Sequence, residues 1–179
     1  GREASVSDLE EYSSEFNFIV DEIDAQEIEK IAISSTKIRN SIIQGDLETT
    51  KKYLGRFFSL TGKVVKGDGL GKQIDYPTAN ILIEEDYKII PKDGVYYIRT
   101  RIDNKLYNGM MNIGHRPTIG NKAKSIEVNL FNFDMDIYDK IISVDVVVKI
   151  RDEKKFSSIN ALKAQLLKDE EHCLKLINK

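Results

Sequence analysis

The feature that most constrains the fold is a series of short segments between residues 57 and 150 in which apolar and polar side chains alternate. In 142–150, an Ile or Val stands at every second position, and Ser143, Asp145 and Lys149 are among the residues between them. Successive side chains of a strand point to opposite faces, so each segment can bury one face. Six short strands of this kind fit a closed antiparallel barrel of Greek-key type, so the predicted fold class is mainly β.

The expected strand boundaries follow from the turn residues between these segments. Asp103-Asn104 is a turn signal between two of them and predicts a β-hairpin. The strands are expected at 57–66, 78–83, 94–102, 105–113, 124–133 and 141–150.

A helix is expected after the last strand, with Ser157 or Ser158 as its cap. Its apolar side chains lie roughly on one face, which should pack on the barrel. These residues are Ile159, Leu162, Leu166, Cys173 and Ile177.

The first part of the chain differs from the rest because helical and strand patterns alternate there. A capped helix is expected near the N-terminus, and apolar alternation over 16–23 predicts a strand. A second helix should begin within 33–39, with Ser or Thr as its N-cap, and a third should cover 47–53 after a Gly-Asp break. We therefore interpret 1–53 as the trailing part of an α/β domain and 54–179 as the barrel domain.

The composition bounds the class of protein. With 179 residues and 41% hydrophobic residues, the chain can build a packed core. A net charge of −2 provides no basic field for nucleic acid or an acidic membrane surface. A single cysteine excludes an internal disulfide framework, and no apolar run approaches the ~20 residues of a membrane span. We expect a cytoplasmic protein with no nucleic-acid or membrane partner.

A glycine-rich loop over 67–80 is the main candidate for a binding site. Glycine has no Cβ, so such a backbone can approach a ligand closely, and successive N–H groups can hold an anion. The glycines and the basic residue beside them are Gly67, Gly69, Gly71 and Lys72. Thr78 and Asn80 follow two residues apart and would project to the same side of an extended segment. Their oxygen atoms suit Mg²⁺, so the loop predicts a nucleoside triphosphate site.

A simpler interpretation of the same loop is a flexible turn. The spacing differs from that of a P-loop, and no Gly-Lys-Ser/Thr is present. In this interpretation, residues 77–80 simply begin a strand, and Thr78 and Asn80 are hydrogen-bonded to each other.

The order of several motifs resembles the riboflavin kinase family from about Leu54 to the C-terminus. The glycine-rich segment ending in Pro-Thr-Ala-Asn is similar to the signature loop of that family. The matching segments are 69–80, Pro91-Lys-Asp-Gly-Val-Tyr, Asn112-Ile-Gly-His-Arg-Pro-Thr, Ile126-Glu-Val-Asn-Leu-Phe and Arg151-Asp-Glu-Lys-Lys-Phe. The chain departs from the family at Asp75, where glycine is usual, and at Lys72, where arginine is common. Asp75 would place a negative charge near the expected phosphates.

The resemblance implies an ATP-dependent kinase that converts riboflavin and ATP to FMN and ADP with Mg²⁺. It assigns the ATP phosphates to the loop glycines and Lys72, and Mg²⁺ to Thr78 and Asn80. It makes Glu127 the catalytic base that orients the riboflavin 5′-hydroxyl, although a lone strand glutamate by itself is more often a surface residue. ATP binding is further assigned to Asn112, and flavin binding to Arg116, Arg151 and Phe156.

A second motif lies upstream of the barrel. Ile33-Ser-Ser-Thr-Lys-Ile-Arg39 resembles a nucleotidylyltransferase motif, and bacterial FAD synthetases join these two domains in this order. Adenylyl transfer in that family uses a His-x-Gly-His motif, whereas this chain has only His115 and His172. We therefore expect 1–53 to be an inactive remnant of an FMN adenylyltransferase domain whose N-terminal portion is missing.

The alternative is a non-catalytic barrel that binds a flavin or nucleotide and regulates another process. The presence of Thr78, Asn80 and Glu127 together favours the enzyme. Flavin products formed from riboflavin, ATP and Mg²⁺ would distinguish the two hypotheses.

Overall fold

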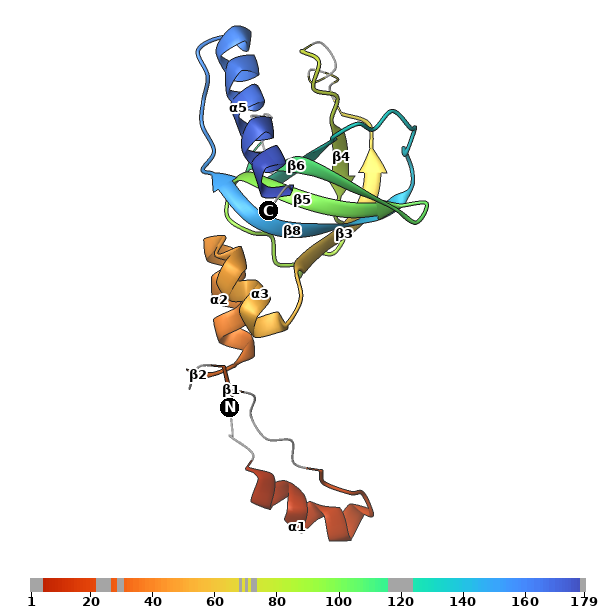
Figure 1. The fold of residues 1–179 in the computed structure, drawn as a ribbon. Coiled ribbons are helices and arrows are strands. Elements are labelled where there is room, and N and C mark those ends of the chain that lie inside the picture. Colours follow the sequence, from red (N-terminus) through yellow and green to blue (C-terminus); the bar gives the residue numbers. More distant parts are fainter. Residues whose placement is uncertain are drawn as a thin grey trace. The chain divides into compact units, whose positions relative to one another are not determined.

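The computed structural model describes residues 5–21, 27–28, 31–67, 69, 71, 74–115 and 124–177 (Figure 1). The chain divides into two compact units, residues 1–33 and 34–179. The first contains helix α1 (Val6–Phe16) and the two-residue strands β1 (Glu27–Ile28) and β2 (Ile31–Ala32), which pair antiparallel.

Helix α1 begins at a capping box. The Ser5 hydroxyl accepts a hydrogen bond from the Asp8 backbone N–H, and the Asp8 carboxylate accepts one from Ser5 N at 2.8 Å. The helix continues to Phe16 and ends at Asn17, whose φ of 53° is left-handed. The strand predicted over 16–23 is therefore wrong, because residues 16–21 hold no strand; residues 22–23 lie outside the described ranges. The alternation there coincides with the end of a helix on which Tyr12 and Phe16 are neighbours.

The second unit begins with two helices, α2 (Ser35–Gln44) and α3 (Leu47–Leu54). Ser34 caps α2, and Asp46 caps α3 by accepting a hydrogen bond from Thr49 N at 3.0 Å. Between them, Gly45 adopts a φ of 75°, which ends α2. The two predicted helices and the break between them are thus confirmed. Helix α3 contacts strands β3 and β8 of the barrel.

Replacement of Leu47 tests whether α3 is part of the barrel core. Its side chain is 3% exposed and belongs to the cluster that fills the barrel. We expect Leu47→Ala to lower the free energy of unfolding by about 2–5 kcal/mol through lost burial and a residual cavity. Chemical denaturation of the whole chain measures this. Ile43→Ala on α2, where the side chain is 54% exposed, is the control and should cost less than ~1 kcal/mol. Equal losses for the two variants would contradict the packing.

Six antiparallel strands close into a barrel in the order β3-β4-β7-β6-β5-β8. The neighbours β7-β6-β5-β8 form a Greek key, since the last strand returns to lie beside the first of three consecutive hairpin strands. The predicted fold class is confirmed. The strands are β3 (Phe58–Val65), β4 (Ala79–Leu82), β5 (Gly94–Ile102), β6 (Lys105–His115), β7 (Lys124–Leu130) and β8 (Ile141–Arg151).

The turn after β5 agrees with the sequence pattern, whereas β6 runs two residues beyond its predicted end at 113 and β7 is shorter than predicted. Asp103 and Asn104 have φ values of 48° and 64°, and two positive values are typical of the tight turn in a two-residue hairpin. Strand β7 ends at Leu130, earlier than the predicted 133, because Asn132 turns the chain with a φ of 52°.

Apolar side chains pack on both sides of the barrel wall. The interior holds residues such as Leu60, Ile98, Met111 and Val144, each fully buried. On the outside, helix α5 (Ile159–Ile177) covers a second cluster formed by Val95, Tyr97, Met110, Phe131 and Cys173. Burial raises the pKa of the Cys173 thiol to about 12, so it is neutral and part of the packing.

Helix α5 lies against the barrel, as its apolar face predicts, and contacts β6 and β8 (Figure 1). Ile159, which was also expected on that face, is 56% exposed at the start of the helix. It begins after Ser158, whose hydroxyl accepts a hydrogen bond from Ala161 N at 3.2 Å. Across the described parts of the chain, we find no helix with the length and apolar character that crossing a membrane requires.

Candidate functional site

One row of paired residues crosses five strands and gathers four of the predicted site residues. Asn80 of β4 pairs with Glu127 of β7, and Glu127 pairs with Asn112 of β6. The row continues from Asn112 to Val95 of β5 and from Val95 to Arg151 of β8. Directly paired residues point to the same face of a sheet, so these side chains share one face.

This face is the outside of the barrel. Ile126 and Val128, on either side of Glu127 in β7, belong to the barrel core. Because side chains alternate along a strand, Glu127 points away from the core. Val95 lies in the cluster beneath α5. The row is therefore on the barrel surface beside α5.

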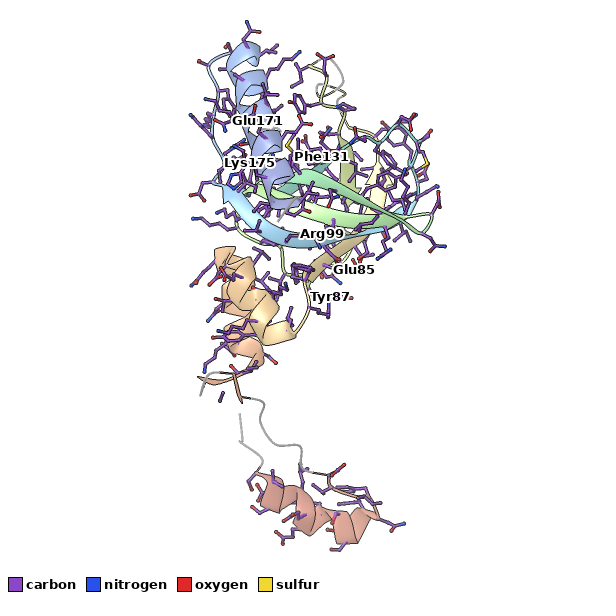
Figure 2. All side chains as sticks on the ribbon, in the orientation of Figure 1. Glu85, Tyr87, Arg99, Phe131, Glu171 and Lys175 are labelled. Carbon is purple, nitrogen blue, oxygen red and sulfur yellow. The ribbon has the colours of Figure 1, made fainter. Side chains whose placement is uncertain are left out.

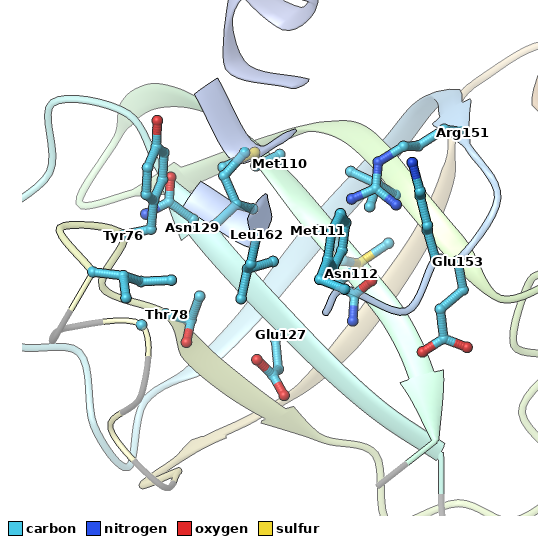
Figure 3. A pocket seen from close by; sticks show the side chains of 16 residues that line it. Tyr76, Thr78, Met110, Met111, Asn112, Glu127, Asn129, Arg151, Glu153 and Leu162 are labelled. Atoms are coloured by element: carbon cyan, nitrogen blue, oxygen red, sulfur yellow. The ribbon is translucent and has the colours of Figure 1, made fainter. Parts of the chain in front are cut away.

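A pocket of about 240 Å³ lies over this row (Figure 3). Its apolar wall comes from both the barrel and α5: Ile74, Val95, Met110, Met111, Phe156, Leu162 and Leu166. Its polar lining is Gly71, Tyr76, Thr78, Asn112, Glu127, Asn129, Arg151, Glu153 and Lys154. Six predicted residues thus meet here: Gly71, Thr78, Asn112, Glu127, Arg151 and Phe156.

The described glycines of the loop lie against the residues that follow it. A Cβ at Gly71 would overlap the Tyr76 backbone oxygen and meet the Thr78 hydroxyl, and one at Gly67 would overlap the Asn80 carboxamide. Position 71 therefore requires glycine, whereas a Cβ at position 67 would have to displace the Asn80 side chain. The loop folds back on its own exit, so Thr78 and Asn80 face the glycine backbone.

Gly69 differs from its neighbours. It has a φ of 71°, in the left-handed region, and open space where a Cβ would lie. Lys72, the expected phosphate ligand, lies outside the described residues, as does Arg116, the expected flavin ligand of the 112–118 segment.

Thr78 borders a second pocket as well as the first. This pocket has a volume of about 490 Å³ and continues from Thr78 toward the segment after β7. Its lining is mainly apolar and aromatic: Val64, Pro77, Ala79, Val128, Leu130, Phe133, Met135, Ile137 and Tyr138, with Asp134 and Asp136. A ligand extending from one pocket to the other would pass Thr78.

Thr78 and Asn80 are suitable ligands for a nucleotide-bound Mg²⁺. Within the described ranges, no group of three His, Cys, Asp or Glu side chains could hold a metal by itself. Thr78 is half-buried and Asn80 is 8% exposed, and both contact the glycine cradle that a Cβ would fill. Mg²⁺ keeps several waters and uses few protein ligands when phosphates supply the remainder. The donor set therefore fits a metal brought in with its nucleotide.

Arg151 is fixed in the wall of the first pocket. Its Nε donates to both carboxylate oxygens of Asp169, at 3.0 and 2.9 Å, and its Nη2 lies 2.8 Å from Asp169 Oδ2. Its Nη1 donates to the Asp152 backbone oxygen at 3.0 Å. The guanidinium carbon lies 5.7 Å from the centre of the Phe156 ring. Arg151 is therefore a neutralised, planar group rather than a mobile cation.

The structure also accounts for the aspartate at position 75. Asp75 has a φ of 63°, a conformation that glycine adopts without strain and Asp tolerates. Its carboxylate accepts a hydrogen bond from Lys163 of α5. The negative charge of Asp75, which the sequence predicts near the phosphates, is therefore paired with Lys163 of α5.

Several lining residues were not identified from the sequence. Leu162 and Leu166 were assigned to packing because they lie on the apolar face of α5, and they line the pocket as well. Tyr76 and Asn129 form the wall between this pocket and a groove beside α5. Asn129 Nδ2 donates to the Pro77 backbone oxygen at 2.8 Å, which fixes the loop exit on β7. The only sequence signal for Asn129 was its place two residues after Glu127, on the same strand face.

Comparisons with known proteins point to one family. A family model described as "Flavokinase: Riboflavin kinase" matches residues 54–177. The bifunctional riboflavin kinase/FMN adenylyltransferase of Buchnera aphidicola subsp. Schizaphis graminum is 39% identical over 181 residues, covering 99% of this chain and 57% of that protein. The protein of the same name from Bacillus subtilis is 38% identical over 146 residues, covering 80% of this chain and 46% of that protein.

A solved structure extends the comparison. A crystal structure from Streptococcus pneumoniae, described as a macrolide-efflux protein, superposes with a TM-score of 0.81 at 36% identity and covers 94% of this chain and 54% of that one. The chain spans about half the length of the curated relatives it matches. On the family match over residues 54–177, the chain belongs to the riboflavin kinase family.

Proposed function

We propose that this chain transfers the γ-phosphoryl group of ATP to the 5′-hydroxyl of riboflavin, giving FMN and ADP. The observation that carries the proposal is the row on which Asn80 and Asn112 flank Glu127, between the glycine-rich loop and an apolar pocket. Phosphoryl transfer needs positioned phosphates, neutralised charge and a group that orients the acceptor hydroxyl. The row supplies these roles in one place.

The pocket beneath α5 suits the riboflavin ring. Met110, Leu162 and Leu166 provide an apolar surface, and Phe156 with the paired Arg151 provides planar groups. A neutral polycyclic ring gains from apolar burial and from stacking on a fixed guanidinium. With the ring there, the ribityl chain would run along the outer face of the barrel toward Glu127.

The pocket on the other side of Thr78 suits adenosine. Its aromatic members are Phe133 and Tyr138, and Val128 and Leu130 of β7 line it together with the segment that follows. A nucleoside bound there would direct its phosphates along Thr78 toward the first pocket. Donor and acceptor would then meet at Thr78 and Glu127.

The side chains at that meeting point have separate roles. Thr78 and Asn80 would hold Mg²⁺, which supplies charge neutralisation at the phosphate oxygens when bound. The half-buried Glu127 carboxylate would accept a hydrogen bond from the riboflavin 5′-hydroxyl and take its proton as transfer proceeds. Asn112, on the next strand, would add an amide donor to the same face. We place the reaction in the cytoplasm, where ATP is available.

The test of this function is product formation by the purified chain. With riboflavin, ATP and Mg²⁺, separation of flavins should show FMN, and omission of ATP should abolish it. Binding of riboflavin without conversion would support the non-catalytic regulatory barrel instead.

We further propose that residues 1–53 derive from the FMN adenylyltransferase portion named in the relatives. The chain holds no His-x-Gly-His sequence, which the resemblance requires for adenylyl transfer. Incubation of the chain with FMN, ATP and Mg²⁺ should therefore form no FAD, while FMN forms from riboflavin under the same conditions. A full-length relative is the positive control. FAD formed by the purified chain would overturn this assignment.

A further inference from the structure

We propose that two adjacent acidic residues of α5, Asp169 and Glu170, are positioning residues that hold opposite walls of the riboflavin pocket. This proposal rests on the function proposed above. Neither side chain lines the pocket, so each acts through a residue that does. Asp169 holds Arg151 on β8, and Glu170 holds Tyr76 at the exit of the glycine-rich loop.

The buried Asp169 carboxylate holds the Arg151 guanidinium in place. Asp169 is 2% exposed, and one of its oxygens also accepts a hydrogen bond from Gln165 Nε2 at 2.9 Å. Arg151 meets it through two nitrogens, a bidentate arrangement that fixes the plane of the guanidinium as well as its position. Loss of the carboxylate would leave a largely buried Arg151 charge without its partner. The guanidinium would then turn, and the wall beside Phe156 would lose its flat surface.

Glu170 holds Tyr76, which lines the wall of the pocket opposite Arg151. The Tyr76 hydroxyl donates to Glu170 Oε2 at 2.9 Å. Burial, together with this hydrogen bond and the nearby acids, raises the pKa of Tyr76 to about 12, so the phenol keeps its proton and donates at neutral pH. The Tyr76 ring packs against the cluster beneath α5 while its face lines the pocket.

The two walls are held from one rigid element. Figure 3 shows Tyr76 and Arg151 on opposite sides of the pocket, with Met110 and Leu162 between them. The Asp75 hydrogen bond from Lys163 adds a further contact between the loop and α5. Since Asp169 and Glu170 are neighbours on a 19-residue helix, a change in either contact alters the width of the pocket. The width decides how a planar ring fits and has little effect on the nucleotide, which binds beyond Thr78.

The test compares Asp169→Asn and Glu170→Gln with Glu171→Gln. Glu171 follows Glu170 on α5 and is exposed (Figure 2). Glu171→Gln removes one negative charge, as the other two variants do, and is therefore the matched control. Each of the first two variants should raise KM for riboflavin about tenfold, because the free energy of the lost charge-assisted hydrogen bond corresponds to about that factor in affinity. The kcat and KM for ATP should change less than ~2-fold, and Glu171→Gln should change nothing. A rise in KM for riboflavin that is no larger than in Glu171→Gln would overturn the proposal.

Tyr76→Phe separates positioning from general stability. It removes the hydroxyl and keeps the ring, so it should raise KM for riboflavin as Glu170→Gln does. The double variant should be no worse than either single one, because both remove the same contact. Fully additive effects would contradict the Glu170 contact. If Asp169→Asn fails to fold, the Tyr76–Glu170 cycle still decides whether α5 holds the pocket.

Riboflavin binding provides a readout that does not depend on catalysis. Quenching of riboflavin fluorescence by the protein gives its Kd in the absence of ATP. If the wild-type chain binds riboflavin but forms no FMN, the kinase function fails, and the same variants still test the positioning role through Kd. If the wild-type chain forms FMN and the variants bind riboflavin normally, only the positioning role fails.

Discussion

Glu127→Gln is expected to lower kcat for FMN formation by about 10²-fold or more, since a positioned base contributes ~10²–10⁴-fold to such a step. Gln keeps the shape and one acceptor oxygen and loses the charge that accepts the proton. KM for ATP should change little, because the nucleotide is held by the loop and the pocket beyond Thr78. Riboflavin binding should survive, since most of its contact area lies against the apolar wall under α5.

The geometry around Glu127 makes this variant informative. Glu127 pairs with Asn80 on one side and Asn112 on the other, and its neighbours Ile126 and Val128 point into the core. The substitution is on the outer face, so the barrel core is unchanged. Stability should therefore remain close to that of the wild type.

Steady-state kinetics of FMN formation, with a riboflavin fluorescence titration alongside, measure the effect. Glu85→Gln removes an exposed carboxylate from the segment after β4 and serves as the control (Figure 2). A Glu127→Gln variant with normal turnover would remove Glu127 from the mechanism. So would a variant that is inactive only because it no longer binds ATP.

The barrel could be predicted from the sequence because the patterns that indicate its strands and turns are local. Alternation over 141–150 and the turn at Asp103-Asn104 each depend on neighbouring residues. The strand predicted over 16–23 failed for the same reason. Helix α1 ends at Phe16 and Asn17 turns the chain in the left-handed region, whereas alternation over residues 18–21 cannot show whether a partner strand lies beside them.

The composition of the site needed information that the sequence pattern does not carry. Strand register decides that Asn80, Glu127 and Asn112 share one row, and register is set by pairing between distant segments. The pattern of the glycine-rich loop supplied Asn80, and resemblance to the family supplied the roles of Glu127 and Asn112. Periodicity alone supplied only that Glu127 lies on the face opposite Ile126 and Val128. The contacts from α5 to Arg151 and Tyr76 lay beyond both, because Asp169 and Glu170 resemble ordinary surface acids in a charged helix.

The position of Asp75 illustrates the same limit. A sequence shows that Asp stands where glycine is usual, and a charge near phosphates is the direct interpretation. The structure adds the left-handed φ and the Lys163 partner, a residue far along the chain. The left-handed φ and the Lys163 partner together explain how Asp can stand where the family usually has glycine.

Asn80→Ala is expected to lower kcat/KM for ATP by about 10²-fold at limiting Mg²⁺, because loss of a ligand weakens binding of the ion. The bound ion itself supplies several kcal/mol of charge stabilisation at the phosphates, and each 1.36 kcal/mol is tenfold in rate. Excess Mg²⁺ should restore part of the loss, since Thr78 and the phosphates still bind the ion. Riboflavin affinity should not change, because Asn80 does not line the riboflavin pocket.

The amide also fills space against Gly67, so its removal has a structural component that the experiment must separate. Asn80→Asp keeps the shape and an oxygen ligand, and it should retain far more activity than Asn80→Ala at every Mg²⁺ concentration. Asn160→Ala, an exposed amide in the first turn of α5, controls for loss of an amide elsewhere. Initial rates across a Mg²⁺ titration measure all three. If Asn80→Ala keeps near wild-type turnover at limiting Mg²⁺, or if its loss does not depend on Mg²⁺, then Asn80 packs against the loop and does not bind the metal.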